Sequence, residues 1–447
     1  MLGRRLEYES QKAVLLYMDA NVRFRISAHM PSIRSVEKVV PLKINRLLIK
    51  NCAADVNDTS YELGVIQHYP DGNTPEPTEK LNNMGGLRVD YDEFGFADIS
   101  GHDLMLPGDI SFGDSAEERL DTEEMERYYR DELRVYRKAL EILTGLEAQG
   151  LTVADYVNSL EPIPDDEVLD ENKRVTDALK YCADTLPYFV ELRESELLPF
   201  HCRRHNLKPP FTCYIQLTIK RGRSKQIHRF EYTKKLYEAE KYLNEVLFGS
   251  RPISVVVRIL DFPSETYRIC RLPVGLRLQV HKVRNAHYKL DHFLSLIENS
   301  GSLDTVEMHC RYHPAHFRPQ ITLNAKKLII ADVPQDDLQL LAENIEHLPN
   351  LEISILPREP FHLPELYSQL IQAWLSAVRP VGASCWISMR NEETANWVLQ
   401  LVRARFEWSE QTERCVTILL NDFTKVEVYY DRIVGDRLVL KVRIVEV

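Results

Sequence analysis

Two short clusters of histidine and cysteine have the residue types and spacing closest to a metal site. One occupies residues 201–205 (His-Cys-Arg-Arg-His), and the other occupies residues 309–313 (His-Cys-Arg-Tyr-His), with His316 beyond it. Each contains Cys-x-x-His, and Zn²⁺ favours nitrogen and sulfur ligands of this kind. The clusters lie about a hundred residues apart, and neither has a Cys-x-x-Cys partner. We therefore expect surface histidines and buried thiols here, and neither a metal nor a cofactor.

A basic run is the second feature with binding chemistry. Residues 203–235 contain ten Lys or Arg and one acidic residue, Glu231. Basic side chains interleaved with aromatic ones can hold nucleic acid. The alternative is a charged hairpin tip that solvates a sheet edge or pairs with an acidic segment of the same chain. The candidate basic patch consists of Lys220, Arg221, Arg223, Lys225 and Arg229, with Tyr214, Phe230 and Tyr232 interleaved.

The sequence lacks the common motifs of enzymes. It has no Gly-rich phosphate loop, no dinucleotide fingerprint, no His-Glu-x-x-His and no Gly-x-Ser-x-Gly. Carboxylates are plentiful, but no spacing singles out a catalytic pair. We therefore predict that the chain is not an enzyme and assign no catalytic residues.

Composition limits the other classes of protein. A chain of 447 residues with 44% hydrophobic and 28% charged residues is typical of a globular protein with two to four units. The formal charge of −11 argues against the whole chain being an electrostatic ligand for nucleic acid. No apolar run approaches the roughly 18 residues that span a bilayer, and no apolar core follows the basic N-terminus. The eight cysteines are scattered, which is typical of free thiols in a reducing compartment. We expect a cytoplasmic protein, with the nucleus as the alternative.

Short helices are predicted before Pro41, and strands after it. Ser10 and Asn21 are candidate helix caps, and Pro31 restarts the chain as a third turn. Residues 42–49 form an apolar strand, and the alternation in residues 60–68 predicts its antiparallel neighbour. A capping box at Ser115 and Glu118 predicts the start of a long amphipathic helix, followed by an acidic connector.

The basic run itself is predicted to be a β-hairpin. Residues 214–219 and 226–232 read as strands, and Gly222 lies in the turn between them. Thr233 is the candidate cap of the helix that follows, and Gly249 closes that helix.

The second half of the chain shows a weak internal repeat. Residues 41–49, 273–280 and 323–330 share a strand-like pattern, and the last two are followed by predicted helices at 290–297 and 338–345. Strand, helix and strand at about 25 residues a step is similar to leucine-rich-repeat packing. The tail then adds a helix with Trp374 inward, a strand, a helix at 392–405 and three antiparallel strands.

These elements predict an α+β fold. It combines short N-terminal helices, mixed sheets with a long amphipathic helix, and an irregular leucine-rich-repeat-like α/β C-terminal half. The expected units are F-box-like helices at 1–40, a small β-rich unit at 41–114, a helical acidic connector at 115–200, a hairpin-helix-strand unit at 201–285 and a repeat-like, F-box-associated-like unit at 286–447.

Residues 6–34 resemble a degenerate F-box, a helical motif that docks onto the Skp1-type linker of a cullin ubiquitin ligase. The matching positions are Leu6, Val14, Leu15, Met18, Ile26 and Ile33, with Pro31 at the turn. The wider chain resembles the F-box C protein-related family, which is expanded in nematodes and carries a domain of unknown function. The resembling segments are residues 8–15, 31–38, 57–65, 68–72, 235–243 and 272–278, and residues 413–418 are similar to the family's F-box-associated region.

The resemblance implies a non-catalytic protein-interaction protein, an F-box-type substrate adaptor. Its N-terminal helices would contact a Skp1-type adaptor, and its repeat-like half would contact a protein substrate. A first alternative is a globular protein whose F-box-like helices belong to its own core. A second is a nucleic-acid-binding protein that uses residues 203–235. Neither nucleic acid nor a membrane is the expected partner.

Overall fold

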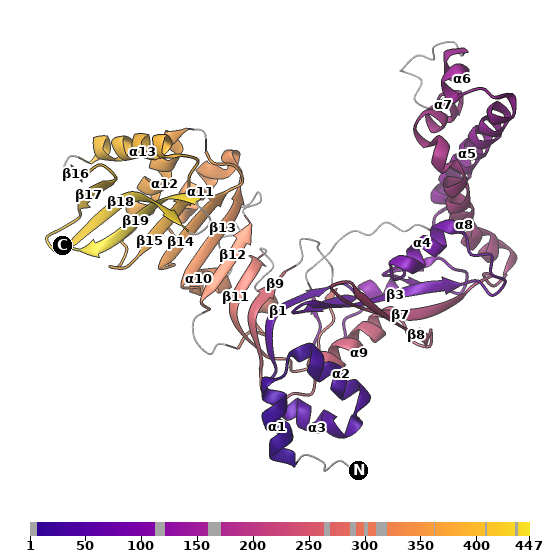
Figure 1. Ribbon diagram of the computed structural model, residues 1–447, viewed down its shortest axis with the longest axis horizontal. Coiled ribbons are helices and arrows are strands. Elements are labelled where there is room, and N and C mark those ends of the chain that lie inside the picture. The colour runs from indigo at the N-terminus through magenta and orange to yellow at the C-terminus, as the bar shows by residue number, and fades with distance from the viewer. Residues whose placement is uncertain are drawn as a thin grey trace.

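One sheet of 15 strands runs through most of the chain in the computed structural model (Figure 1). The structure describes residues 7–111, 121–159, 171–262, 269–286, 292–298, 303–309, 320–361, 363–406, 409–433 and 437–447. The strand order is β16-β17-β18-β19-β15-β14-β13-β12-β11-β9-β1-β2-β3-β7-β8. The sheet therefore joins the two ends of the chain, and its mixture with helices is the α+β fold that the sequence predicts.

The centre of the sheet is parallel. The strands β1 (Lys43–Lys50), β9 (Val255–Asp261), β11 (Leu278–Ala286), β12 (Thr305–His309), β13 (Lys327–Val333), β14 (Glu352–Pro357) and β15 (Ser384–Ser388) all run in one direction. Lys282, Thr305, Lys327, Glu352 and Ser384 form one row across five of them. Each step of this row takes roughly 22 to 32 residues of chain, as in repeat proteins. The three segments of the predicted internal repeat thus become β1, β11 and β13.

Helices cover one face of the C-terminal strands (Figure 1). They are α11 (Leu338–Ile345), α12 (Pro364–Ser376) and α13 (Glu392–Arg405), with the short α10 (Gln320–Asn324) before them. Trp374 in α12 is fully buried, as predicted. Strands β17 (Cys415–Leu419), β18 (Thr424–Ile433) and β19 (Arg437–Glu446) close the sheet in antiparallel order, again as predicted, and the short β16 (Ser409–Gln411), which was not predicted, pairs with β17 at the edge.

One predicted helix of the repeat is wrong in its described part. Residues 292–298 form a 3-10 turn that ends in an extended bridge between Ile297 and Leu278. The backbone N–H of Leu278 donates to Leu296 O at 2.7 Å, and the N–H of Glu298 donates to Leu278 O at 2.9 Å. These bonds hold the segment alongside the start of β11, which a helix could not do. Residues 290 and 291 lie outside the described residues.

The N-terminal side of the sheet is antiparallel. It contains β1, β2 (Ala53–Val56), β3 (Thr59–His68), β7 (Thr212–Arg221) and β8 (Ser224–Glu231). The predicted direct pairing of residues 60–68 with β1 is wrong, because β2 lies between them. Two-residue turns at 51–52 and 57–58 fold the chain back twice, and Cys52 and Asn57 take the left-handed conformation there (φ 55° for each).

Three short helices precede the sheet: α1 (Tyr8–Tyr17), α2 (Ala20–His29) and α3 (Arg34–Val39), with a 3-10 turn at Pro31–Ile33. Their caps differ from the prediction. Ser10 lies inside α1, and Asp19 caps α2 by accepting a hydrogen bond from Asn21 N at 2.9 Å. The side chain of Asn21 is instead buried, where it donates to Val56 O and accepts from the Tyr61 hydroxyl.

A helical arm projects from the sheet beside β3 (Figure 1). It contains α5 (Glu123–Gln149), α6 (Val153–Ser159), α7 (Glu171–Cys182) and α8 (Leu186–His205). Thr122 caps α5 through a hydrogen bond from Met125 N at 3.2 Å, whereas the predicted capping box at residues 115 and 118 lies outside the described residues. Apolar residues of α5, α7 and α8 form the arm's own core: Val135, Ala139, Val175, Ala178, Leu179 and Leu186.

The remaining elements pack on the antiparallel strands. They are α4 (Glu76–Met84), β4 (Asp90–Tyr91), β5 (Ala97–Asp98), β6 (Ile110–Ser111), α9 (Leu236–Phe248) and β10 (Ile269–Cys270). α9 begins three residues after the predicted cap Thr233, because Glu238 accepts a hydrogen bond from Lys235 N and so caps the helix there. α9 and the hairpin strands share a small apolar core that includes Leu63, Val65, Ile215 and Leu236.

Candidate functional site

A buried cluster of three charged residues fixes the N-terminal helices to the rest of the protein. Arg23 of α2, Glu37 of α3 and Arg251 after α9 are almost completely buried. Arg23 Nε donates to Glu37 Oε1 at 3.0 Å, and Arg251 Nη2 donates to both carboxylate oxygens at 2.8 and 2.9 Å. A buried ion that loses its partner is strongly destabilising. The cluster therefore makes the position of the helices relative to α9 part of the folded structure.

The cluster also binds the backbone around Pro41. Arg23 donates to the carbonyl oxygens of Glu37, Val40 and Pro41 at 2.7 to 2.9 Å. Burial lowers the pKa of Arg23, and it lowers the pKa of neighbouring Lys38 to about 8. Lys38 Nζ donates to Val246 O of α9 at 2.7 Å. These polar contacts join two helical segments that are far apart in sequence, and they add to the apolar packing of Phe24 in α2 against Phe248 in α9.

The predicted docking residues of the N-terminal helices do not form one exposed face. Leu15 is buried with Val36 and Val40, and Met18, Ile26 and Ile33 are half-buried. Val14 and Pro31 are exposed, while Leu6 lies outside the described residues. Four apolar side chains that were not predicted are exposed on the same helical segment, namely Tyr8, Tyr17, Met30 and Val39, with Tyr17 at 88% and Met30 at 48%. From this exposed set we select Val14, Tyr17 and Met30, which we call the N-terminal face.

The predicted basic patch lies on the β7–β8 hairpin, and Gly222 takes its turn conformation as predicted (φ 55°). Two of its five cations are neutralised. Lys220 pairs with Glu62 at 2.7 Å, and Arg221 pairs with Asp58 at 2.8 Å. Within the described part of the chain, Arg223, Lys225 and Arg229 have no carboxylate within ion-pair distance. The patch is therefore smaller than its sequence suggests.

Most of the interleaved aromatic rings are also engaged. Tyr214 packs edge-on against His68, with ring centroids 6.0 Å apart. The Tyr232 hydroxyl donates to Asp90 Oδ1, and Tyr91 N donates to the same hydroxyl at 3.3 Å. Phe230 is the ring that remains exposed, at 52%. One free ring is too few for the stacked platform that holds single-stranded nucleic acid.

Every residue of β8 is exposed, on both faces of the strand. β8 is the last strand at its end of the sheet, so the groups along its outer edge have no neighbouring strand in the described chain. Figure 1 shows β8 at the margin, beyond β7 and α9. The opposite end of the sheet is β16, which has only three residues. Strand edges with unpaired N–H and C=O groups are ready to pair with another chain.

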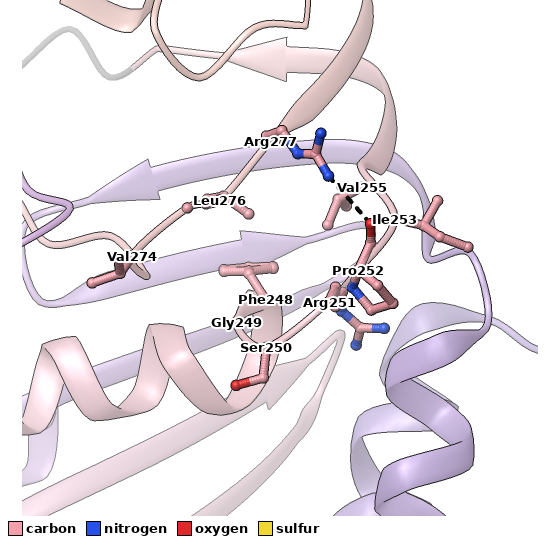
Figure 2. A pocket seen from close by; sticks show the side chains of 11 residues that line it. Phe248, Gly249, Ser250, Arg251, Pro252, Ile253, Val255, Val274, Leu276 and Arg277 are labelled. Carbon is pink, nitrogen blue, oxygen red and sulfur yellow. Dashed lines mark hydrogen bonds between the residues drawn. The ribbon is translucent and has the colours of Figure 1, made fainter.

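A cavity of about 310 Å³ lies between the loop after α9 and the loop before β11 (Figure 2). Its lining contains no carboxylate, imidazole or thiol. The polar side chains at its rim are already engaged: Arg277 donates to Pro252 O at 3.2 Å, Ser250 donates to Glu245 at 2.8 Å, and Arg251 points toward α3. The cavity therefore offers no acid, base or metal ligand.

A second buried glutamate, Glu240 of α9, lies beneath the hairpin. Its carboxylate is 3.6 Å from Cys52 Sγ, and burial raises its pKa to about 8. The Cys52 thiol is buried as well, and burial raises its pKa. Such a site favours a neutral carboxyl group at neutral pH.

The histidine and cysteine clusters do not form a metal site in the described residues. His201 and His205 lie one turn apart on α8, with ring centroids 4.6 Å apart, and Cys202 is buried. In the second cluster His309 Nε2 donates to Asn285 Oδ1 at 2.8 Å, and residues 310–316 lie outside the described residues. No group of three or more potential ligands comes together in the part of the chain that the structure describes. The seven cysteines described there are free thiols, as predicted.

No helix among the described residues is long and apolar enough to cross a bilayer.

Sequence reasoning missed the Arg23–Glu37–Arg251 cluster and the open edge of β8. A signal for the cluster was present, because Arg23 lies between apolar neighbours in a short helix and near the apolar side chains of residues 33–40. Arg251, more than two hundred residues later, carries no local signal. The open edge depends on strand order, which the sequence of the hairpin alone does not contain.

Comparison with known proteins assigns part of the chain. Residues 235–391 match a family described as a domain of unknown function (DUF3557). The match begins at the start of α9 and includes all the parallel strands from β9 to β15. No curated protein and no solved structure matches the chain.

Proposed function

We propose that this chain is a non-catalytic adaptor that binds one protein through its N-terminal face and a second protein through its sheet. The observation that carries the proposal is that exposed apolar side chains lie on helices that buried contacts hold in a fixed position. Val14 and Tyr17 project from α1, whose Leu15 packs against Val36 of α3 and Val40, and the buried Arg23–Glu37–Arg251 cluster fixes α2 and α3 next to α9. A few apolar anchors on a helix are enough to fill a partner's groove.

The fixed position of the N-terminal helices should raise the affinity for a partner protein. A surface that is already ordered loses less conformational entropy when a partner binds. Leu15, Val36 and Val40 fill the core of the helical unit, so the exposed side chains are not needed for its packing. This arrangement combines the two interpretations of the sequence, because one face of the helices belongs to the chain's own core and another faces outward.

In its more specific form, the proposal identifies the first partner as a Skp1-type linker of a cullin ubiquitin ligase, in the cytoplasm. The resemblance of residues 6–34 to an F-box supports this choice. The contact residues would then be Val14, Tyr17 and Met30, rather than the buried Leu15. The second partner would be a substrate protein.

A binding titration with purified Skp1-type linker tests the adaptor role. We expect the full chain to bind, and Val14→Asp and Tyr17→Asp each to weaken binding at least tenfold, because a carboxylate would be buried in the interface. Tyr181→Asp is the matched control, since Tyr181 is 82% exposed on the helical arm and far from α1 in sequence. Failure of the full chain to bind, or equal binding by all three variants, would contradict the proposal.

A further inference from the structure

We propose that the outer edge of β8 binds an extended acidic peptide, which adds to the sheet as a further strand. This surface is separate from the N-terminal face, and the proposal does not depend on docking there. The expected ligand has acidic side chains four residues apart with an apolar residue midway between them.

The turn of the hairpin determines which groups of β8 face outward. Arg221 and Ser224 flank the two-residue turn at Gly222 and Arg223. In such hairpins the flanking pair exchanges its N–H and C=O bonds, and alternate residues after it do the same. Ser224, Gln226, His228 and Phe230 therefore bond to β7. Lys225, Ile227 and Arg229 turn their backbone N–H and C=O groups toward the open side. Glu231 follows at the next such position, where its C=O already accepts a hydrogen bond from Thr233 N at 2.8 Å, so the free part of the edge ends at Arg229.

The same three residues place their side chains on one face of the strand, because side chains alternate along a strand. Lys225 and Arg229 are four residues apart, a separation of about 13 Å along an extended chain. Ile227 lies midway between them and is 46% exposed. A peptide strand paired with this edge would place two of its carboxylates opposite the cations and an apolar side chain opposite Ile227.

Both cations are held in position without being neutralised. Arg229 Nε donates to Oε1 of the fully buried Gln216 at 3.1 Å, and Lys225 Nζ donates to Asn83 O at 2.8 Å. Neither bond involves a carboxylate, so each side chain keeps its full charge. Holding the cations in place before binding reduces the entropy that a ligand must overcome. The complementary ligand is therefore anionic.

The edge suits a peptide better than nucleic acid. A peptide can use the outward N–H and C=O groups of β8, whereas a phosphate backbone can use only the cations. Three unpaired cations are few for a polyanion whose binding depends on charge alone, since each neutralised phosphate adds to the affinity. Phe230, which lies on the other face of β8, adds apolar contact for the intervening residues of a peptide.

A second copy of the chain fits the edge less well. Charged residues commonly protect a strand edge from pairing with itself. In the self-pairing register centred on Ile227, which joins the apolar side chains, Lys225 would face Arg229 of the other copy. Like charges directly opposite one another are destabilising. The exposed Ile227 between two cations therefore favours an acidic partner over self-association.

Fluorescence anisotropy with a labelled peptide tests this inference. The probe is Thr-Glu-Thr-Val-Thr-Glu-Thr, and the control peptide replaces both glutamates by glutamine. We expect the full chain to bind the probe at least tenfold more tightly than the control. Hydrogen exchange should slow at the amides of Lys225, Ile227 and Arg229 when the probe binds.

Two pairs of variants separate the backbone contribution from the charge contribution. Ile227→Pro removes one outward N–H without removing a bond to β7, and a strand edge tolerates proline there. It should weaken binding at least tenfold, while Ile227→Val should not change it. Lys225→Gln combined with Arg229→Gln should also weaken binding at least tenfold, whereas the surface pair Lys208→Gln and Lys234→Gln should leave it unchanged.

Three outcomes would overturn the proposal. The first is equal affinity for the acidic and the neutral peptide, or binding that Ile227→Pro leaves intact. The second is a single-stranded oligonucleotide that displaces the probe and binds more tightly than it, which would identify a nucleic-acid site. The third is a dimer in solution that Ile227→Pro dissociates, which would identify a second copy as the occupant of the edge.

Discussion

The N-terminal helices and the β7–β8 hairpin use arginine and glutamate in opposite ways. In the helices, Arg23 and Glu37 are buried together with Arg251, and the apolar Val14 and Tyr17 face solvent. In the hairpin, Arg223 and Arg229 face solvent without a carboxylate partner in the described chain, and the carboxylate of the buried Glu240 lies 3.6 Å from the Cys52 thiol. One region uses its charges for structure, and the other leaves its charges available.

This difference teaches that residue type alone does not identify the binding surface. The apolar residues predicted to dock are mostly needed for packing, and two of the five cations predicted to bind are already paired. What remains available in each region is a small set of residues on a rigid support. Four measurements test this difference between the structural charges of the N-terminal helices and the available charges of the hairpin.

The largest effect is expected from Glu37→Gln. The substitution leaves the buried guanidinium groups of Arg23 and Arg251 without a carboxylate, which costs about 3–5 kcal/mol. Hydrogen exchange in residues 20–40 should report this loss as faster local opening of α2 and α3. Glu9→Gln is the control, because Glu9 is exposed and forms a surface ion pair with Lys12, and exchange should then be unchanged. Wild-type protection in Glu37→Gln would show that the cluster does not fix the helices.

The buried Glu240 predicts the opposite pH behaviour to that of an ion-paired carboxylate. Its folded-state pKa of about 8 is above the ordinary value of 4.5, so its contribution to stability is complete below about pH 4.5 and is lost as the pH rises through 8. The decline should reach about 1.4 kcal/mol per pH unit at most. Urea unfolding followed by exchange in α9 would measure it.

Glu240→Gln tests that assignment, because glutamine has the same shape and no charge. The stability of this variant should vary less with pH between about 5 and 8, and the variant should be more stable than the wild type at pH 8. A wild-type pH profile in Glu240→Gln would assign the pH dependence to other groups.

A smaller effect is expected at the support of the hairpin. A Cβ added at Gly64 of β3 would overlap Gly85 O, so Gly64→Ala must shift the backbone of the turn after α4. Overpacking of this kind costs about 1–3 kcal/mol. Gly145→Ala in α5 is the counterpart, since its Cβ would meet nothing within 4 Å. It should stabilise the arm by up to about 1 kcal/mol. Equal melting temperatures of Gly64→Ala and Gly145→Ala would contradict the claim that tight packing at Gly64 supports the hairpin.

The smallest effect belongs to the hairpin edge itself. Arg223→Ala and Ile227→Ala remove exposed side chains, so the free energy of unfolding should change by no more than about 0.5 kcal/mol. Thermal melting of the two variants beside the wild type measures this directly. A larger loss of unfolding free energy would show that these side chains are needed for folding. The hairpin edge would then have a structural role, as the charged residues of the N-terminal helices do.

Elements with strong local patterns were predicted well. The helix at 392–405 coincides with α13, and the hairpin, the last three strands and the inward Trp374 are as predicted. Their periodicity and turn residues are properties of a few consecutive residues. The order of the strands was less accessible, because the pairing of β1 with β9 joins residues that are more than two hundred positions apart.

The candidate sites show the same limit. Apolar spacing predicted helices at residues 8–39, but whether Val14 or Leu15 faces inward depends on α3 and on Arg251. The basic run was visible, yet Asp58 and Glu62, which neutralise part of it, come from β3 and the turn before it. Charge along a sequence does not reveal which cations are paired in space.

The place of β1 in the sheet has a consequence for synthesis of the protein. β1 is made within the first fifty residues, and β2 can pair with one side of it at once. Its other side waits for β9, which begins at Val255. At the usual elongation rates of about 5–20 residues per second, that wait lasts roughly 10 to 40 s. During it, Leu42 and Ile44 of an unfinished sheet are open to other chains, and the nascent protein depends on protection until the later half emerges.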